Sequence, residues 1–316
     1  MVSLPWANQT EVVEFVLGGF SSNRQLNVFL FMMFSVFYVF IVSGNVLIVL
    51  LVLLSRHLHT PMYFFLVNLS FLEIWYTSNL VPKMLLIIVA DQKTVSVAGC
   101  LAQFYFFGSL AATECLLLAV MSYDRYLAIC HPLHYPTLMT GALCTRLAAS
   151  SWLCSFLLTA VTLVLLSRLT FCGPNEIDHF FCDFTPLVHL SCVDTSLTET
   201  IAYATSSAVT LVPFLLIAAS YSCILAALLR IPSGTGRQKA FSTCSSHLTL
   251  VTVFYGTLIA TYLVPSANSS RLLRKGSSLL YTILTPMFNP IIYSLRNRDI
   301  HDALKNCLRR RPAFRR

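Results

Sequence analysis

The chain has 316 residues, of which 56% are hydrophobic and only 11% are charged. A water-soluble protein carries about twice that charged fraction, so the composition excludes an ordinary soluble domain. The formal net charge is +8, and a run of arginines at the C-terminus contributes much of it. The sequence therefore predicts one integral membrane domain with short ends and no separate soluble module.

The N-terminal segment, residues 1–26, is polar and mixed. It lacks the apolar core of a cleaved signal peptide, so we expect the first membrane-spanning helix to start insertion itself. The segment holds an N-glycosylation sequon with Asn8 as the acceptor. This pattern is short and common, and it matters only if the N-terminus faces the lumen.

Seven apolar runs follow, and each is long enough for the roughly 20 residues that cross a bilayer as a helix. They cover about residues 27–54, 61–90, 97–129, 141–167, 197–229, 240–264 and 277–295. Seven crossings place the two ends of the chain on opposite sides of the membrane. We thus expect an all-α fold: an N-terminal segment (1–26), a seven-helix bundle (27–296) and a basic tail with a short amphipathic helix (297–316).

The charges between the runs predict the orientation of the bundle. Lysine and arginine dominate one set of connections and the tail, whereas the other set carries most of the acids. The positive-inside rule then places the tail in the cytoplasm and the N-terminus outside. The arginines at the end of the tail follow a spanning helix, so we expect them to meet anionic lipid rather than nucleic acid.

Several polar or helix-bending residues lie inside the predicted spans. They are Gly44, Asn45, Asn68, Glu73, Glu114, Pro213, Asn289 and Pro290. Polar side chains in a membrane normally face the interior of the bundle, where they meet each other or water. We therefore expect a bundle with a polar interior, to which Glu114 belongs together with an ion or a water. The prolines free backbone carbonyls and allow a helix to bend.

An acid and an arginine, Asp124 and Arg125, stand together where the third run ends. A buried arginine is tolerable only if a partner or water satisfies its donors, and Asp124 can do so. Two interpretations remain open on spacing alone. The pair is either an anchor that extends toward the membrane surface, or a lock that opens to admit a cytoplasmic partner.

Four of the 11 cysteines fall on the outer side of the membrane. They are Cys100, Cys172, Cys182 and Cys192. In an oxidising compartment four such thiols predict two disulfides. The spacings of His179 to Cys182 and of His189 to Cys192 also fit metal ligands, an alternative that oxidation of the thiols would remove.

Several stretches together resemble one family. They are LHTPMYFFL (58–66), MSYDRYLAIC (121–130), SY (220–221), KAFSTCSSHL (239–248) and PMFNPIIYSLRN (286–297). In this order they resemble the olfactory, or odorant, receptors of the rhodopsin-like G-protein-coupled type, over about residues 15–305. The resemblance implies a receptor of the plasma membrane, and of the ciliary membrane of olfactory neurons, that is not an enzyme and holds no cofactor or metal.

The resemblance also implies how the loops are tied. Cys100 matches the cysteine of the third helix that pairs with Cys182, and Cys172 with Cys192 matches the additional loop disulfide of the family. One departure is Ser122, where alanine is common. Both side chains are small, so we expect little effect from it.

Coupling to a G protein is implied for a set of residues at the inner end. They are Asp124, Arg125, Tyr126, Tyr221, Asn289, Pro290 and Tyr293. Arg125 would turn toward the G protein, Tyr221 and Tyr293 would line the same opening, and Asn289 with Pro290 would form the flexible point. The implied partner is a heterotrimeric G protein of the stimulatory olfactory type, whose activation raises cyclic AMP.

The ligand site is expected in the outer half of the bundle. On the third helix a spacing of three to four residues predicts one shared face for Phe104, Phe107, Gly108, Ala111 and Ala112. The resemblance adds Thr205, Ser206, Thr210, Tyr255, Leu258, Ile259 and Tyr262. Close helix packing is an alternative role for the small residues. Amine receptors of the wider family carry an acid where Phe107 stands, so a small neutral volatile odorant is expected.

Two other classes of protein compete with a receptor as the interpretation of this sequence. A transporter or channel would use Glu73 and Glu114 on an ion path, but the sequence has no detectable inverted repeat and no series of charges along a pore. An enzyme is less favoured still. The histidines of the cytoplasmic loops are accompanied by neither a serine and aspartate set nor a glycine-rich phosphate loop.

Overall fold

The computed structural model describes residues 12–19, 23–89, 93–172, 174–230, 234–262, 276, 278–296 and 298–309. Inside the helices, the description leaves out the side chains of residues 234–243, 260–262, 293–296, 298 and 308–309. The sequon at Asn8 and the end of the tail after Arg309 lie outside the described residues, as do the side chains of Tyr262 and Tyr293.

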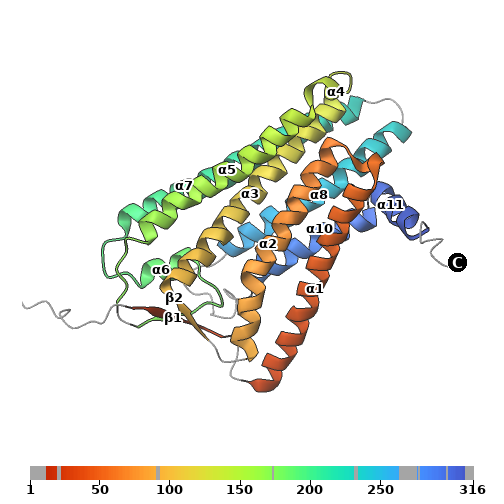
Figure 1. Cartoon of the computed structure of the whole chain (residues 1–316). Helices are drawn as coiled ribbons and strands as arrows, with labels where there is room; N and C mark the ends of the chain where they lie inside the picture. Colours follow the sequence, from red (N-terminus) through yellow and green to blue (C-terminus); the bar gives the residue numbers. More distant parts are fainter. Residues whose placement is uncertain are drawn as a thin grey trace, which may run out of the picture.

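Long helices run side by side and form the bundle (Figure 1). Among the described residues, five helices are long and apolar enough to cross a membrane: α1 (Arg24–Leu54), α2 (Pro61–Val89), α3 (Val97–Cys130), α5 (Gly141–Leu166) and α7 (Ser196–Arg230). Two shorter apolar helical stretches follow in the described part of the chain, Cys244–Ile259 and Leu280–Ile292. The first lies within α8 (Gly234–Tyr262), and the second joins the π-helical turn η2 (Leu280–Leu284) to α10 (Thr285–Arg296). These seven regions confirm the predicted bundle.

Helix α3 is the central helix of the bundle, because it contacts α2, α5, α7 and α8. Its start is fixed by Ser96, whose hydroxyl accepts a hydrogen bond from the backbone N–H of Gly99 at 3.1 Å. This is the usual N-terminal cap of a helix, since the first backbone N–H groups have no partner within the helix. The helix therefore begins immediately after an outer strand and ends at the inner loop.

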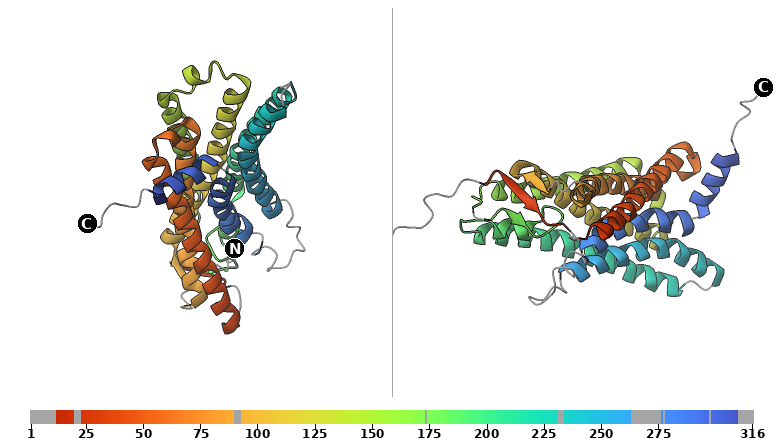
Figure 2. Two further views of the ribbon diagram at one scale, coloured as in Figure 1. Left: turned by 90° about the vertical axis from the view of Figure 1, so that its right-hand side faces the viewer. Right: turned by 90° about the horizontal axis from the view of Figure 1, so that it is seen from below.

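Short elements cover the two ends of the bundle. The strands β1 (Glu14–Leu17) and β2 (Thr94–Ser96) lie with α6 (Phe184–His189) at one end (Figure 1). The short helix α4 (Tyr135–Leu138) and the last described helix, α11 (Arg298–Arg309), lie toward the other end (Figure 1). The view from below also shows α11, in dark blue, at the end opposite the strands (Figure 2). The first two spans are joined by a single 3-10 turn, η1 (Arg56–Leu58).

A three-stranded sheet forms at the outer end and was not part of the predicted all-α fold. Strand β1 is its central strand, antiparallel to β2 and parallel to β3 (Glu176–Ile177). Strands this short carry too little alternation of apolar and polar residues to be recognised in the sequence. The N-terminal segment is thus partly ordered, and its strand joins two outer loops that lie far apart in the sequence.

The predicted amphipathic helix of the tail is α11. Its Ile300 and Ala303 are buried in the core cluster at the inner end of the bundle. The hydroxyl of Tyr63 in α2 donates a hydrogen bond to Oδ2 of Asp299 at 2.9 Å. The helix is therefore held by an apolar face and by a hydrogen bond to the start of α2.

Helices α1 and α10 pack closely at Gly44. A Cβ atom at this position would lie 2.8 Å from Cβ of Pro290 in α10, which is closer than real Cβ contacts come. The neighbouring Asn45 is fully buried, and its amide donates to the carbonyl of Ile41 at 3.0 Å. The glycine thus allows the close approach of the two helices, as small residues do in membrane bundles.

Candidate functional site

The inner end of α3 carries the predicted pair of Asp124 and Arg125. The Asp124 side chain is almost fully buried, and the Arg125 side chain is 11% exposed. Nε of Arg125 donates to Oδ2 of Asp124 at 3.0 Å, and Nη2 donates to the same oxygen. The arginine therefore folds back onto its own helix, where Nε and Nη2 have a carboxylate partner.

A second partner of Asp124 comes from the loop that follows α3. The hydroxyl of Tyr135 in α4 donates to Oδ1 of Asp124 at 2.8 Å. Burial and the neighbouring carboxylate of Asp124 raise the pKa of the Tyr135 phenol, so this hydroxyl stays protonated and remains a donor at neutral pH. Tyr135 was not predicted as a site residue, because the pattern of residues around it gives no signal for this contact.

Two further side chains meet next to the pair. The hydroxyl of Tyr221 in α7 and Nδ1 of His247 in α8 share a hydrogen bond of 2.7 Å, and the two rings stack with an interplanar angle of 17°. His247 is 3% exposed and lies within electrostatic range of Arg125. His247 stands in one of the stretches that carry the family resemblance, yet no role was predicted for it.

An apolar cluster closes the inner end around these groups. Ile224 and Leu228 of α7 and Cys244 of α8 are buried there, and Tyr126 and Tyr221 pack against them. Helices α3, α7 and α8 therefore meet at this level, so a partner that inserts between them must separate them. Of the predicted coupling residues, the structure brings Asp124, Arg125, Tyr126 and Tyr221 to this end of the bundle.

A polar group joins α2, α3 and α10 in the middle of the bundle. The amide of Asn289 donates to a carboxyl oxygen of Glu73, and the carboxyl of Glu114 interacts with that of Glu73. All three side chains are buried. The predicted polar interior is therefore present, and it lies between the outer and inner ends of α3.

The outer end of α3 is tied to the long loop before α7. Disulfides join Cys100 to Cys182 and Cys172 to Cys192, with Cα–Cα distances of 5.4 Å and 5.9 Å. Both predicted pairs are thus present. The metal alternative needed thiols at Cys182 and Cys192, and these sulfurs are bonded to other sulfurs. Within the described residues, no group of three or more His, Cys, Asp or Glu side chains is placed to hold a metal ion.

Phe107 lies directly under that loop and is 6% exposed. Its ring centroid is 5.1 Å from that of Phe181 in the loop, 5.5 Å from Tyr76 in α2 and 5.9 Å from Tyr281 in η2. Ala111, one turn further along α3, packs against the same cluster. The structure thus forms an aromatic site below the outer loop, to which Phe181 contributes although the sequence analysis did not include it.

The predicted face of α3 is divided between two sides of the helix. Phe104 belongs to a separate cluster with Leu166 of α5 and Val188 of α6. A Cβ at Gly108 would lie 3.1 Å from Cγ2 of Thr159 in α5, so this glycine packs against that helix. Each residue turns the helix by about 100°, so Phe107 and Gly108 point in different directions. Gly108 therefore allows close packing of α3 against α5, which is the alternative role given above for the small residues.

The remaining residues of the predicted ligand set differ in burial. On α7, Thr205 and Thr210 are half-buried and Ser206 is exposed. On α8, Tyr255 is 5% exposed and packs against the aromatic rings of Phe254 and Phe214, whereas Ile259 is 50% exposed. Leu258 packs against the same core cluster that contains Tyr255, and Ala112 is half-buried.

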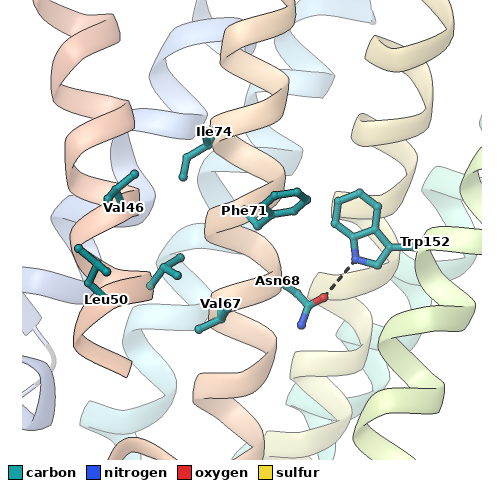
Figure 3. Close-up of a pocket in the computed structure, with 8 residues that line it drawn as sticks. Val46, Leu50, Val67, Asn68, Phe71, Ile74 and Trp152 are labelled. Carbon is teal, nitrogen blue, oxygen red and sulfur yellow. Dashed lines mark hydrogen bonds between the residues drawn. The ribbon is translucent and has the colours of Figure 1, made fainter. Parts of the chain in front are cut away.

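A separate groove of about 390 Å³ lies between α1, α2 and α5 (Figure 3). Its walls include exposed apolar side chains such as Leu50 and Phe71, as on a surface that faces lipid. The indole N–H of Trp152 donates to Oδ1 of Asn68 at 3.2 Å along this groove (Figure 3). The groove is thus distinct from the aromatic site under the outer loop.

The fold and the inner site together define a class of proteins. A bundle of seven membrane helices, with a buried acid and arginine pair at the inner end of the third, is the arrangement of rhodopsin-like G-protein-coupled receptors. The crystal structure of squid rhodopsin matches this chain with a TM-score of 0.73, covering 91% of this chain and 82% of that chain. The two are 16% identical, so this match supports the fold alone.

Sequence comparison gives the family. The family model described as olfactory receptor matches residues 34–311. Human olfactory receptor 11A1 is 52% identical over 301 residues, which cover 95% of each chain. Mouse olfactory receptor 1M1 is 46% identical, covering 96% of this chain and 97% of that receptor. The chain belongs to the olfactory receptor family, and it is a multi-pass plasma membrane receptor that senses odorants and is not an enzyme.

Proposed function

We propose that this receptor binds a small neutral volatile odorant in the outer half of the bundle and activates a stimulatory olfactory-type G protein, which raises cyclic AMP. One observation carries the proposal. Helix α3 holds Phe107 in the aromatic site at its outer end and the Asp124 and Arg125 pair at its inner end. These two positions are about 25 Å apart along the helix axis.

The chemistry around Phe107 supports a neutral ligand. The rings of Phe181, Tyr76 and Tyr281 surround it, so the site offers apolar walls and tyrosine hydroxyls. Ligand sites of this kind are largely apolar with few polar groups that fix orientation. The other proposed contacts are the residues of α3, α7 and α8 predicted from the sequence, except Gly108, which packs against α5, and with Phe181 added from the loop.

Activation requires that the odorant bind one arrangement of the helices better than another, because equal affinity for both would shift no equilibrium. In the arrangement described here α3, α7 and α8 are packed together at the inner end, and Arg125 is held by Asp124. We infer that this arrangement is the closed one. The odorant would favour an open arrangement in which Arg125 leaves Asp124 and meets the G protein.

The test is cyclic AMP in cells that express the receptor with a stimulatory olfactory-type G protein. The cells are exposed to straight-chain alcohols, aldehydes and ketones and, separately, to the matching amines. We expect a dose-dependent rise for at least one neutral series and none in cells that lack the receptor. A response to amines alone would contradict the neutral-ligand proposal. Activation of a different G-protein class would contradict the proposed coupling.

A further inference from the structure

The loop segment that covers Phe107 is short and is held at both ends. It runs from the end of β3 at Ile177 to Cys182, which is bonded to Cys100 of α3. Between them, Phe180 and Phe181 are buried in the cluster that contains Phe107. The backbone N–H of Cys182 also donates to the side-chain oxygen of Gln103 at 3.0 Å. One end of this segment is therefore fixed to α3.

The other end is fixed by the N-terminal strand β1. The backbone N–H of Gly18 donates to the carbonyl of Ile177 at 2.7 Å and to that of His179 at 3.1 Å. The backbone N–H of Val16 donates to the carbonyl of Asn175 at 2.8 Å, and the Asn175 amide donates to the carbonyl of Glu14 at 2.8 Å. The covering segment is thus bonded to β1 immediately before its two phenylalanines.

Strand β1 is itself anchored by two side chains. Phe15 and Leu17 are fully buried in a cluster that includes Cys100, Cys182 and Phe171. The rings of Phe15 and Phe171 are in edge contact at 5.2 Å. On its other edge, the backbone N–H of Leu17 donates to the carbonyl of Lys93 at 2.7 Å, next to β2. The strand therefore joins the start of α3 to the loop above it.

We propose that Phe15 and Leu17 are positioning residues for the odorant site. They hold β1 in place, β1 holds the segment from Asp178 to Phe181, and that segment closes the aromatic site over Phe107. The N-terminal strand would thus set the affinity for odorants without a contact to the ligand. This inference rests on the proposed location of the odorant site. It adds to the odorant site a strand that precedes all of the helices in the sequence.

A test without odorant measures closure of the site directly. The variant Ala111→Cys provides a thiol in the site, and the rate at which a membrane-impermeant thiosulfonate labels it is measured on surface receptors. The receptor that retains Ala111 gives the background labelling. Leu17→Ala removes buried volume that holds β1, so we expect labelling to become about tenfold faster or more. Val13→Ala is the matched control, because Val13 precedes β1 and is 72% exposed. An unchanged rate in Leu17→Ala would overturn the inference.

If Leu17→Ala is retained inside the cell, Leu17→Val is used in its place. Valine keeps an apolar contact at this position with a smaller side chain. Surface receptors with Leu17→Val should label faster than those with Val13→Ala, and equal rates count against the inference. This assay needs no odorant. Faster labelling in a receptor that no odorant activates would therefore support the positioning role and count only against the proposed function.

A mutant cycle on odorant response then separates positioning from general folding. Leu17→Ala should raise the half-maximal odorant concentration in the otherwise unchanged receptor, but should add little once Phe181→Ala has removed the ring that the strand positions. Fully additive effects at matched surface expression would show that the strand acts by another route. They would overturn the inference while leaving the odorant response itself established.

Discussion

Asp124 holds the Arg125 side chain against α3, and its two carboxyl oxygens have different partners. One oxygen accepts from the guanidinium of Arg125, and the other accepts from the hydroxyl of Tyr135. A buried carboxylate with donors on both sides is well satisfied, so the arginine stays turned onto its own helix. Loss of either donor weakens this arrangement and favours release of the arginine.

Tyr135→Phe should therefore raise basal cyclic AMP. The change removes one hydrogen bond to a charged acceptor, worth about 1.5 kcal/mol, which corresponds to about a tenfold shift of the equilibrium between closed and open arrangements. Tyr38→Phe is the control, since the Tyr38 hydroxyl bonds Ser78 at 3.1 Å, in a contact between α1 and α2. The measurement is cyclic AMP without odorant at matched surface expression. Equal basal levels in the wild type and Tyr135→Phe would contradict the role assigned to Tyr135.

The sequence predicted the Asp124 and Arg125 contact because the two residues are adjacent and one must satisfy the other in a membrane. It did not predict Tyr135, whose partner depends on how the loop after α3 folds back. The contact between Tyr221 and His247 likewise joins two helices, and no local spacing encodes it. The disulfide partners needed the family resemblance, because four cysteines alone permit three pairings.

Close contacts between whole helices set the geometry of the bundle. Gly44 lets α1 approach α10 at Pro290, directly beside Asn289, which donates to Glu73 of α2. The three helices are therefore tied within one short stretch of α10. A side chain at Gly44 would push against a rigid proline ring rather than against a flexible side chain.

Gly44→Ala should destabilise the receptor. The added methyl group overpacks the contact with Pro290 and costs about 1–3 kcal/mol. Gly256→Ala provides the contrast, because a Cβ at Gly256 meets no atom within 4 Å. Alanine favours a helix over glycine by up to about 1 kcal/mol, so this second variant should be neutral or stabilising. Thermal unfolding of the receptor in detergent measures both. Equal melting temperatures for the two variants would show that α1 and α10 are not tightly packed there.

At the level of elements, the sequence predicted the spans well because a bilayer demands long apolar runs. It placed the start of the sixth span at residue 240, whereas α8 begins at Gly234, because an apolar run marks only the part of a helix that lies in the membrane. The sheet of β1, β2 and β3 was not predicted. Its strands are two to four residues long, and they come from segments far apart in the sequence that meet only in the folded protein. The residues predicted to share one face of α3 lie on two faces, because α3 has neighbouring helices on several sides.

The whole molecule is organised around α3, which passes from the outer disulfide through the polar middle to the inner pair. Outer loop, core and inner loop therefore all contact one rigid helix. A change of helix arrangement at Phe107 has a direct mechanical route to Arg125, through the packing of α3 against α7 and α8. We propose that this route couples odorant binding to the G protein.

The most direct test compares odorant-evoked cyclic AMP in the wild type, Phe107→Ala and Arg125→Ala at equal surface expression. Loss of the Phe107 ring removes the proposed apolar contact with the ligand, so the half-maximal odorant concentration should rise by about tenfold or more. Loss of Arg125 should abolish the response and leave the receptor at the cell surface. Normal odorant-evoked cyclic AMP in Arg125→Ala would contradict the account that odorant binding at one end of α3 is transmitted to the arginine at the other.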